Sequence, residues 1–154
     1  MMISTEVTDI DGRTALHIAA SYGRDESVKF LVTEMGNAIN QVDNAGKTPL
    51  HLASQNGHKK TVVTLLSLGA KTTIKDIRGL TPLHIAVGIG NMEIMKYLLL
   101  NEADINAMTD LGASPLNVAA SNGHLEVVNA LLEKGAHRML TIWMLTVLPC
   151  YATQ

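Results

Sequence analysis

Two series of glycines recur along the chain at a nearly constant interval, and this interval limits the folds that are open to it. In each series the spacing is 34 residues once and 33 residues twice. The first series is Gly12, Gly46, Gly79 and Gly112, and the second is Gly23, Gly57, Gly90 and Gly123. A fixed period of this length indicates similar units that stack one on another.

Other residues keep the same register. A hydroxyl residue follows each glycine of the first series by two positions, at Thr14, Thr48, Thr81 and Ser114. Three positions further on the chain carries His17, His51, His84 and Asn117. The single interval of 34 places one extra residue near Met35 and Gly36, where we expect a loop, because loops tolerate insertions.

The third copy shows how one unit is built. Gly79 favours a turn, because glycine adopts positive φ without steric cost. Thr81 is suited to cap a helix and Pro82 suits its first position. Gly90 ends this helix, and apolar residues recur with helical spacing over residues 91–100. The sequence therefore predicts two helices per unit, each too short to be stable alone and stabilised by stacking on neighbouring units.

These residues resemble the ankyrin repeat. The family's pattern D-x-x-G-x-T-P-L-H-x-A is present at residues 43–53 and 76–86. The first copy has Ala15 in place of the proline, and the fourth has Asn117 in place of the histidine. The resemblance extends over residues 9–136. It implies an all-α solenoid of antiparallel helix pairs, with β-turn fingers beside the first helices and a concave side that binds other proteins.

The repeat register divides the chain into six segments. We expect an N-terminal extension at 1–8, four ankyrin repeats at 9–42, 43–75, 76–108 and 109–138, and an atypical hydrophobic tail at 139–154.

The histidines suggest a metal site, but their spacing argues against one. Equivalent residues of stacked helices lie about 8–10 Å apart, whereas zinc needs nitrogens at about 2 Å. We therefore expect His17, His51 and His84 to hydrogen-bond the adjoining turn and join one finger to the next. His58 and His124 share another register position, where a structural role is also expected.

No residues with the spacing of a catalytic site are visible. The sequence has no G-x-S-x-G, P-loop or H-E-x-x-H motif, and Cys150 has no histidine near it. We predict no enzymatic activity, no catalytic residue, no metal and no cofactor, and the resemblance implies the same.

Composition excludes several kinds of partner. The net charge of −2 does not favour nucleic acid or an anionic membrane surface. The longest apolar-rich segment, residues 139–148, is shorter than the roughly 20 residues that span a membrane. A single cysteine fits a reducing compartment, so we expect an intracellular, cytoplasmic protein, with the nucleus as an alternative.

The resemblance places the freely varying residues beside the turn glycine and before the cap glycine. As candidates for protein binding we take Tyr22, Lys47, Gln55, Asn56, Ile77, Arg78, Leu80, Ile89, Asp110 and Leu111. The framework does not need the aliphatic members of this set, which we expect to cluster beside Arg78 as an interface does. Scattered exposed aliphatic residues are also common, so both explanations stay open.

Loop asparagines are hydroxylated in some members of the family. Asn106, after Leu98 and Asp104–Ile105, resembles such a site, and Asn40 is a weaker match. A plain loop-stabilising asparagine is the competing interpretation.

The repeat pattern stops after Ala136. The tail reads as a helical cap, with apolar residues at helical spacing from Leu140 to Leu148, or as a frame-shifted or alternatively spliced end. Self-association through this tail also stays open. Our leading hypothesis is an adaptor, scaffold or regulator that binds an unidentified protein. The alternatives are a non-binding spacer, a truncated isoform or fragment of a longer repeat protein, and a regulatory subunit of an enzyme.

Overall fold

The computed structural model describes residues 7–136, and eight short α-helices account for most of its regular structure. Their bounds are α1 Ala15–Ser21, α2 Asp25–Thr33, α3 Pro49–Gln55, α4 Lys59–Ser67, α5 Pro82–Gly88, α6 Met92–Leu100, α7 Pro115–Ser121 and α8 Leu125–Leu131, with a π-helical turn, η1, at Leu132–Ala136. No strand occurs between residues 7 and 136. The all-α prediction is confirmed, and the structure of the predicted tail lies outside the described residues.

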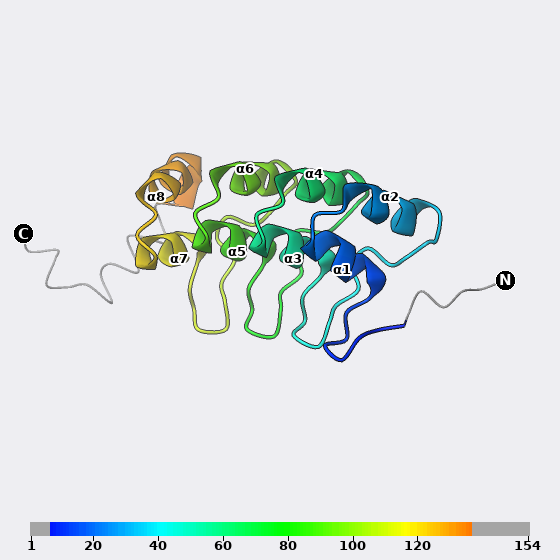
Figure 1. Cartoon of the computed structure of the whole chain (residues 1–154). Coiled ribbons are helices and arrows are strands. Elements are labelled where there is room, and N and C mark those ends of the chain that lie inside the picture. Colours follow the sequence, from blue (N-terminus) through cyan, green and yellow to red (C-terminus); the bar gives the residue numbers. More distant parts are fainter. Residues whose placement is uncertain (1–6, 137–154) are drawn as a thin grey trace, which may run out of the picture.

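The helices form two layers (Figure 1). The odd-numbered helices make one row and the even-numbered helices make the other. Each helix contacts its partner in the pair, the odd-numbered helices contact one another along their row, and α4 contacts both α2 and α6. Long loops leave the odd-numbered row and project as parallel fingers. No described helix is both long enough and apolar enough to cross a membrane.

The hydroxyl residues start the odd-numbered helices as predicted. Thr81 is extended, its hydroxyl accepts from the backbone N–H of His84, and Pro82 begins α5. The same capping box occurs at Thr14, Thr48 and Ser114. A cap of this kind stabilises a helix by about 1 kcal/mol, which helps helices of seven residues that would not persist alone.

One predicted helix boundary shifts by a residue. The segment expected from Asn91 begins instead at Met92, because the Asn91 side chain accepts from the backbone N–H of Ile94 and caps the helix. The extra residue of the first unit falls after the end of α2, where Gly36 has φ +67°, so the predicted position of the insertion is confirmed.

The core is aliphatic and continuous along the stack. Leu65, Leu98 and Leu131 occupy equivalent positions and are fully buried, as are Leu83 and Met95. Burying a side chain of this size contributes about 1.5–3 kcal/mol. The unit boundaries drawn at residues 43, 76 and 109 remain a prediction.

Candidate functional site

The equivalent histidines link neighbouring fingers. In unit two, Nδ1 of His51 accepts from the backbone N–H of Thr48 at 3.0 Å. Its Nε2–H then donates to the carbonyl of Leu80, in the next finger, at 2.9 Å. His17 and His84 make the same bonds to the carbonyls of Lys47 and Ala113. The prediction that these imidazoles join one finger to the next is confirmed.

Burial favours the neutral form of the three histidines. Burial, the largest cause, lowers the pKa of His17, His51 and His84 below the ordinary value of 6.5. The neutral tautomer carries its proton on Nε2, because Nδ1 accepts from a backbone N–H. Both ring nitrogens are thus engaged within the protein.

The second histidine position is also structural. Nε2 of His58 bonds the carbonyl of Ser21 at 2.9 Å, and Nε2 of His124 bonds that of Gly88 at 2.9 Å. Each imidazole also covers the cap glycine of the preceding unit, Gly23 or Gly90. This register position therefore fastens one helix pair to the next.

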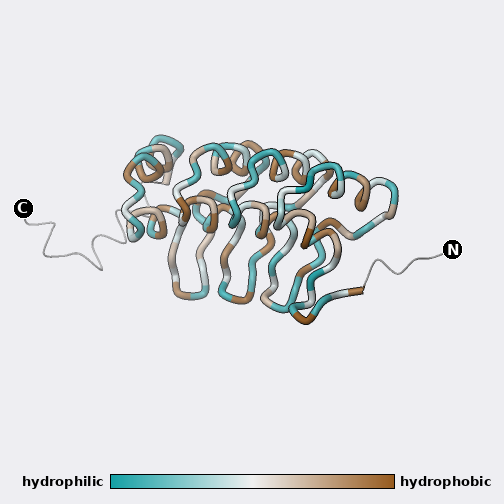
Figure 2. The backbone as a smooth tube through the Cα atoms, in the orientation of Figure 1, coloured by the Kyte–Doolittle hydropathy of each residue, from teal (hydrophilic) through white to brown (hydrophobic). Residues whose placement is uncertain are grey.

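The fingers are braced by their own backbones. Oδ1 of Asp76 accepts from the N–H groups of Arg78 and Leu80, both at 2.9 Å. The N–H of Ile77 donates to Ala45 in the preceding finger, and the N–H of Asp110 donates to Arg78. The side chains near the finger tips take no part in these bonds, and Figure 2 shows hydrophobic segments at the lower ends of several fingers.

A groove of about 550 Å³ lies between the third and fourth fingers. Its walls include five of the predicted residues, Ile77, Arg78, Leu80, Asp110 and Leu111. Ile77 is 67% exposed and Leu111 is 97% exposed. A smaller cavity that shares Ile77, Arg78 and Leu80 continues past Lys47 toward the second finger. The structure thus brings these side chains together in one hollow.

Three further groove residues stand outside the set of ten candidates. Thr109, Ala113 and Val118 complete the wall. Val118 shares its register position with Ile18, Leu52 and Ile85, which are exposed, buried and half-buried respectively, so the repeat pattern does not mark it as a groove residue. It is half-buried because its side chain lies on the finger side of α7.

The other candidates lie elsewhere. Ile89 is 45% exposed at the end of α5 but does not line the groove. Gln55 accepts from Lys47 Nζ at 2.8 Å, and the Asn56 side chain donates to Ser21 of unit one at 2.9 Å. Tyr22 is exposed on the first unit, at the far end of the stack.

The loop asparagines differ in their contacts. The Asn40 side chain accepts from the backbone N–H of Lys71 at 3.0 Å, so it stabilises the adjoining loop. Asn106, its equivalent two units on, is exposed, and its own N–H donates to Asp104. Hydroxylation of Asn106 stays a prediction.

Comparison with known proteins agrees with the geometry. A family model described as ankyrin repeats (3 copies) matches residues 2–76 and 70–141. The chain belongs to the ankyrin repeat family. This fold is typically a non-enzymatic module that mediates protein–protein interaction.

Similar segments occur in much larger proteins. The human transient receptor potential cation channel subfamily A member 1 is 45% identical over 62 residues, which are 39% of this chain and 6% of that protein. Mouse rabankyrin-5 is 44% identical over 57 residues, 37% of this chain and 5% of that protein. The Arabidopsis thaliana E3 ubiquitin-protein ligase XBAT32 is 35% identical over 90 residues, 42% and 18% respectively. The matched segments therefore span less than a fifth of each of these relatives.

Proposed function

We propose that this ankyrin repeat chain is a protein-binding module that acts as an adaptor, scaffold or regulator, and that its binding surface is centred on the groove between the third and fourth fingers. The observation that carries the proposal is the exposure of Ile77 and Leu111 on either side of that groove. Neither side chain is needed to hold the fingers, whose bonds run through backbone atoms and Asp76.

The chemistry of the groove supports a polypeptide partner. An apolar centre with an arginine and a polar rim is the usual anatomy of a protein interface. Here the aliphatic side chains form the centre, while Arg78 and Asp110 supply one charge of each sign. An aliphatic side chain of the partner would fill the hollow, and its backbone or a charged neighbour would meet these two residues.

The relatives support a modular role. Their names are those of a cation channel subfamily member, rabankyrin-5 and an E3 ubiquitin-protein ligase, and these names give no chemical activity in common. A segment common to them is better suited to recognition than to catalysis. With its single cysteine, the chain is expected to act in the reducing cytoplasm or in the nucleus.

Capture from cell lysate with matched variants tests the proposal. The double variant Ile77→Asp with Leu111→Asp places two charges in the groove and leaves every finger hydrogen bond intact. Val63→Asp, at an exposed valine on α4, is the control. Proteins identified by mass spectrometry with the wild type and the control should be lost with the double variant. Recovery of the same proteins by all three chains would refute the groove as the binding site. Recovery of no protein by any chain would favour the alternative of a non-binding spacer.

A further inference from the structure

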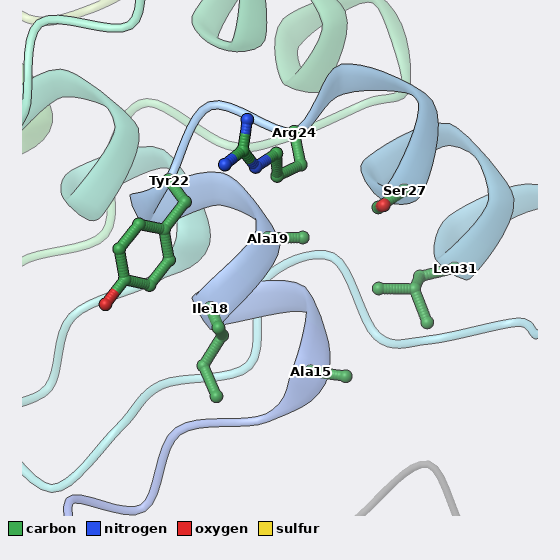
Figure 3. A pocket seen from close by; sticks show the side chains of 7 residues that line it. All are labelled: Ala15, Ile18, Ala19, Tyr22, Arg24, Ser27 and Leu31. Atoms are coloured by element: carbon green, nitrogen blue, oxygen red, sulfur yellow. The ribbon is translucent and has the colours of Figure 1, made fainter.

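The first unit has a flank that no other unit covers among residues 7–136, away from the proposed binding groove; we call it the open flank. A cavity of about 600 Å³ lies between α1 and α2, and its walls include Ala15, Tyr22, Arg24, Ser27 and Leu31. Figure 3 shows these side chains on the two helices of the first unit and on the turn that joins them.

Comparison with the equivalent positions of units two to four shows that side chains of this flank lack the cover of a preceding unit. Ala15 is exposed, whereas the prolines at its three equivalent positions are buried. Ser27 is exposed, whereas its equivalents Thr61, Ile94 and Val127 are at most 1% exposed. Leu31 is half-buried, whereas all three equivalent leucines are fully buried. In units two to four these positions are covered by the preceding unit, so the flank has the surface of a stacking interface.

Arg24, the charged residue of this flank, occupies a position that forms a hydrogen bond between units elsewhere in the stack. Arg24 stands where His58 and His124 stand in units two and four. Those imidazoles donate to a carbonyl near the end of the preceding unit's first helix and cover its cap glycine. Arg24 is exposed, and its guanidinium is also a hydrogen-bond donor, for which another unit would have to supply the carbonyl.

The fourth unit carries the matching half of the interface. Ala120 and Val128 are half-buried, whereas the residues at all their equivalent positions in units one to three are fully buried. Among the described residues, no atom lies within 4 Å of the place that a Cβ would take at Gly112 or Gly123. The equivalents Gly12, Gly46 and Gly79 would all collide with the next finger. The downstream flank of unit four is therefore shaped to receive another unit.

We propose that two copies of this chain associate head to tail, with the open flank of the first unit of one copy on the downstream flank of the fourth unit of the other. The contacts follow the register of the internal interfaces. Arg24 would donate to the carbonyl of Ser121, as His58 does to Ser21. The N–H of Ile10 would donate to the carbonyl of Leu111, as Asp110 does to Arg78.

This arrangement is directional. The two flanks are different surfaces, so the contact is heterologous and its rotation need not close into a ring. Each added copy leaves one flank of each kind open. The full chain should therefore show a mass that rises continuously with concentration rather than a stable dimer.

Analytical ultracentrifugation of the full chain over a wide concentration range tests the proposal. Ser27→Glu disables only the upstream flank, and Val128→Glu disables only the downstream flank. Each variant alone should remain monomeric at concentrations where the wild type associates. An equimolar mixture of the two should form a one-to-one dimer and nothing larger, because one intact flank of each kind remains.

Matched variants exclude an effect of charge or of unfolding. Asn129→Glu adds the same charge next to Val128, at a position that is exposed in all four units, and should associate like the wild type. If circular dichroism shows that Val128→Glu does not fold, Arg24→Glu, at an exposed residue of the upstream flank, should still weaken association. A chain that is monomeric throughout overturns the proposal. So does association that survives Ser27→Glu, or that disappears only when residues 1–6 or 137–154 are removed.

Discussion

Replacing His51 by asparagine separates the two tasks of the histidine, and the fourth unit shows that an asparagine performs the first. Asn117 occupies the equivalent position, and its Oδ1 accepts from the N–H of Ser114 at 2.9 Å, so it keeps the helix cap. Its Nδ2 is buried and finds no hydrogen-bond partner among the described residues, which include no finger after the fourth. His51→Asn should likewise retain the cap at Thr48, and its shorter side chain should lose the bond to the next finger.

The magnitude follows from these contacts. The lost bond from Nε2 to the carbonyl of Leu80 is worth about 1 kcal/mol net. That carbonyl keeps the N–H of Asp76 as a partner, so it adds little to the loss. The new amide, buried without a partner, costs about 1–3 kcal/mol. We expect the free energy of unfolding to fall by about 2–4 kcal/mol in total, a large part of a typical 5–15 kcal/mol.

Urea unfolding at neutral pH, followed by far-ultraviolet circular dichroism, measures this loss. Amide hydrogen exchange should quicken in the third finger, around Asp76 and Leu80, more than in the first. His17→Asn is a replicate, because Nε2 of His17 bonds the carbonyl of Lys47 at 2.9 Å in the same way. A loss below about 0.5 kcal/mol, within the scatter of surface substitutions, would show that the link between fingers contributes nothing to stability.

Three further predictions concern the stack. Burial lowers the pKa of the three finger histidines below 6.5, so below pH 6.5 the unfolded chain binds more protons than the folded chain. Urea titrations should therefore find that the free energy of unfolding loses nothing to these histidines above this pH and falls as the pH decreases below it. The slope is limited to about 4 kcal/mol per pH unit for three protons. Leu83→Ala, at a fully buried leucine, should lower the free energy of unfolding by about 2–5 kcal/mol, and a smaller loss in thermal or urea unfolding would mean that the site collapses around the cavity. Gly79→Ala should destabilise more than Gly112→Ala, although both glycines have similar positive φ, because a Cβ at Gly79 would lie 2.6 Å from the backbone nitrogen of Asp110; equal losses of unfolding free energy would contradict the close contact between fingers.

The helices could be predicted because their signals are local. Thr81 and Pro82 mark the start of α5 by hydrogen-bonding capacity and fixed φ, and α5 begins at Pro82. The role of His51 also followed from register, since a polar side chain repeated at one buried position has to find its partner in the adjoining unit. The first residue of α6 was misplaced because an asparagine can cap a helix or begin it.

The groove could be predicted only in part, because its shape depends on how adjacent units meet. Ile77 and Leu111 stand out in the sequence, since the framework does not require apolar residues at finger tips. Ile89 also stood out, yet it lies outside the groove wall. Val118 was missed because the aliphatic residues at its register position range from exposed Ile18 to buried Leu52, so the repeat pattern does not tell whether such a residue lies in the core or at the surface.

Methyl NMR of the chain, titrated with a protein recovered in the lysate capture, shows whether the groove between the third and fourth fingers holds the partner polypeptide. We predict that the methyl signals of Ile77, Leu80 and Leu111 shift on binding while that of Leu100, exposed at the end of α6, stays in place. Shifts confined to α4 and α6, with the groove methyls unmoved, would mean that the partner binds on the even-numbered helices and not in the groove.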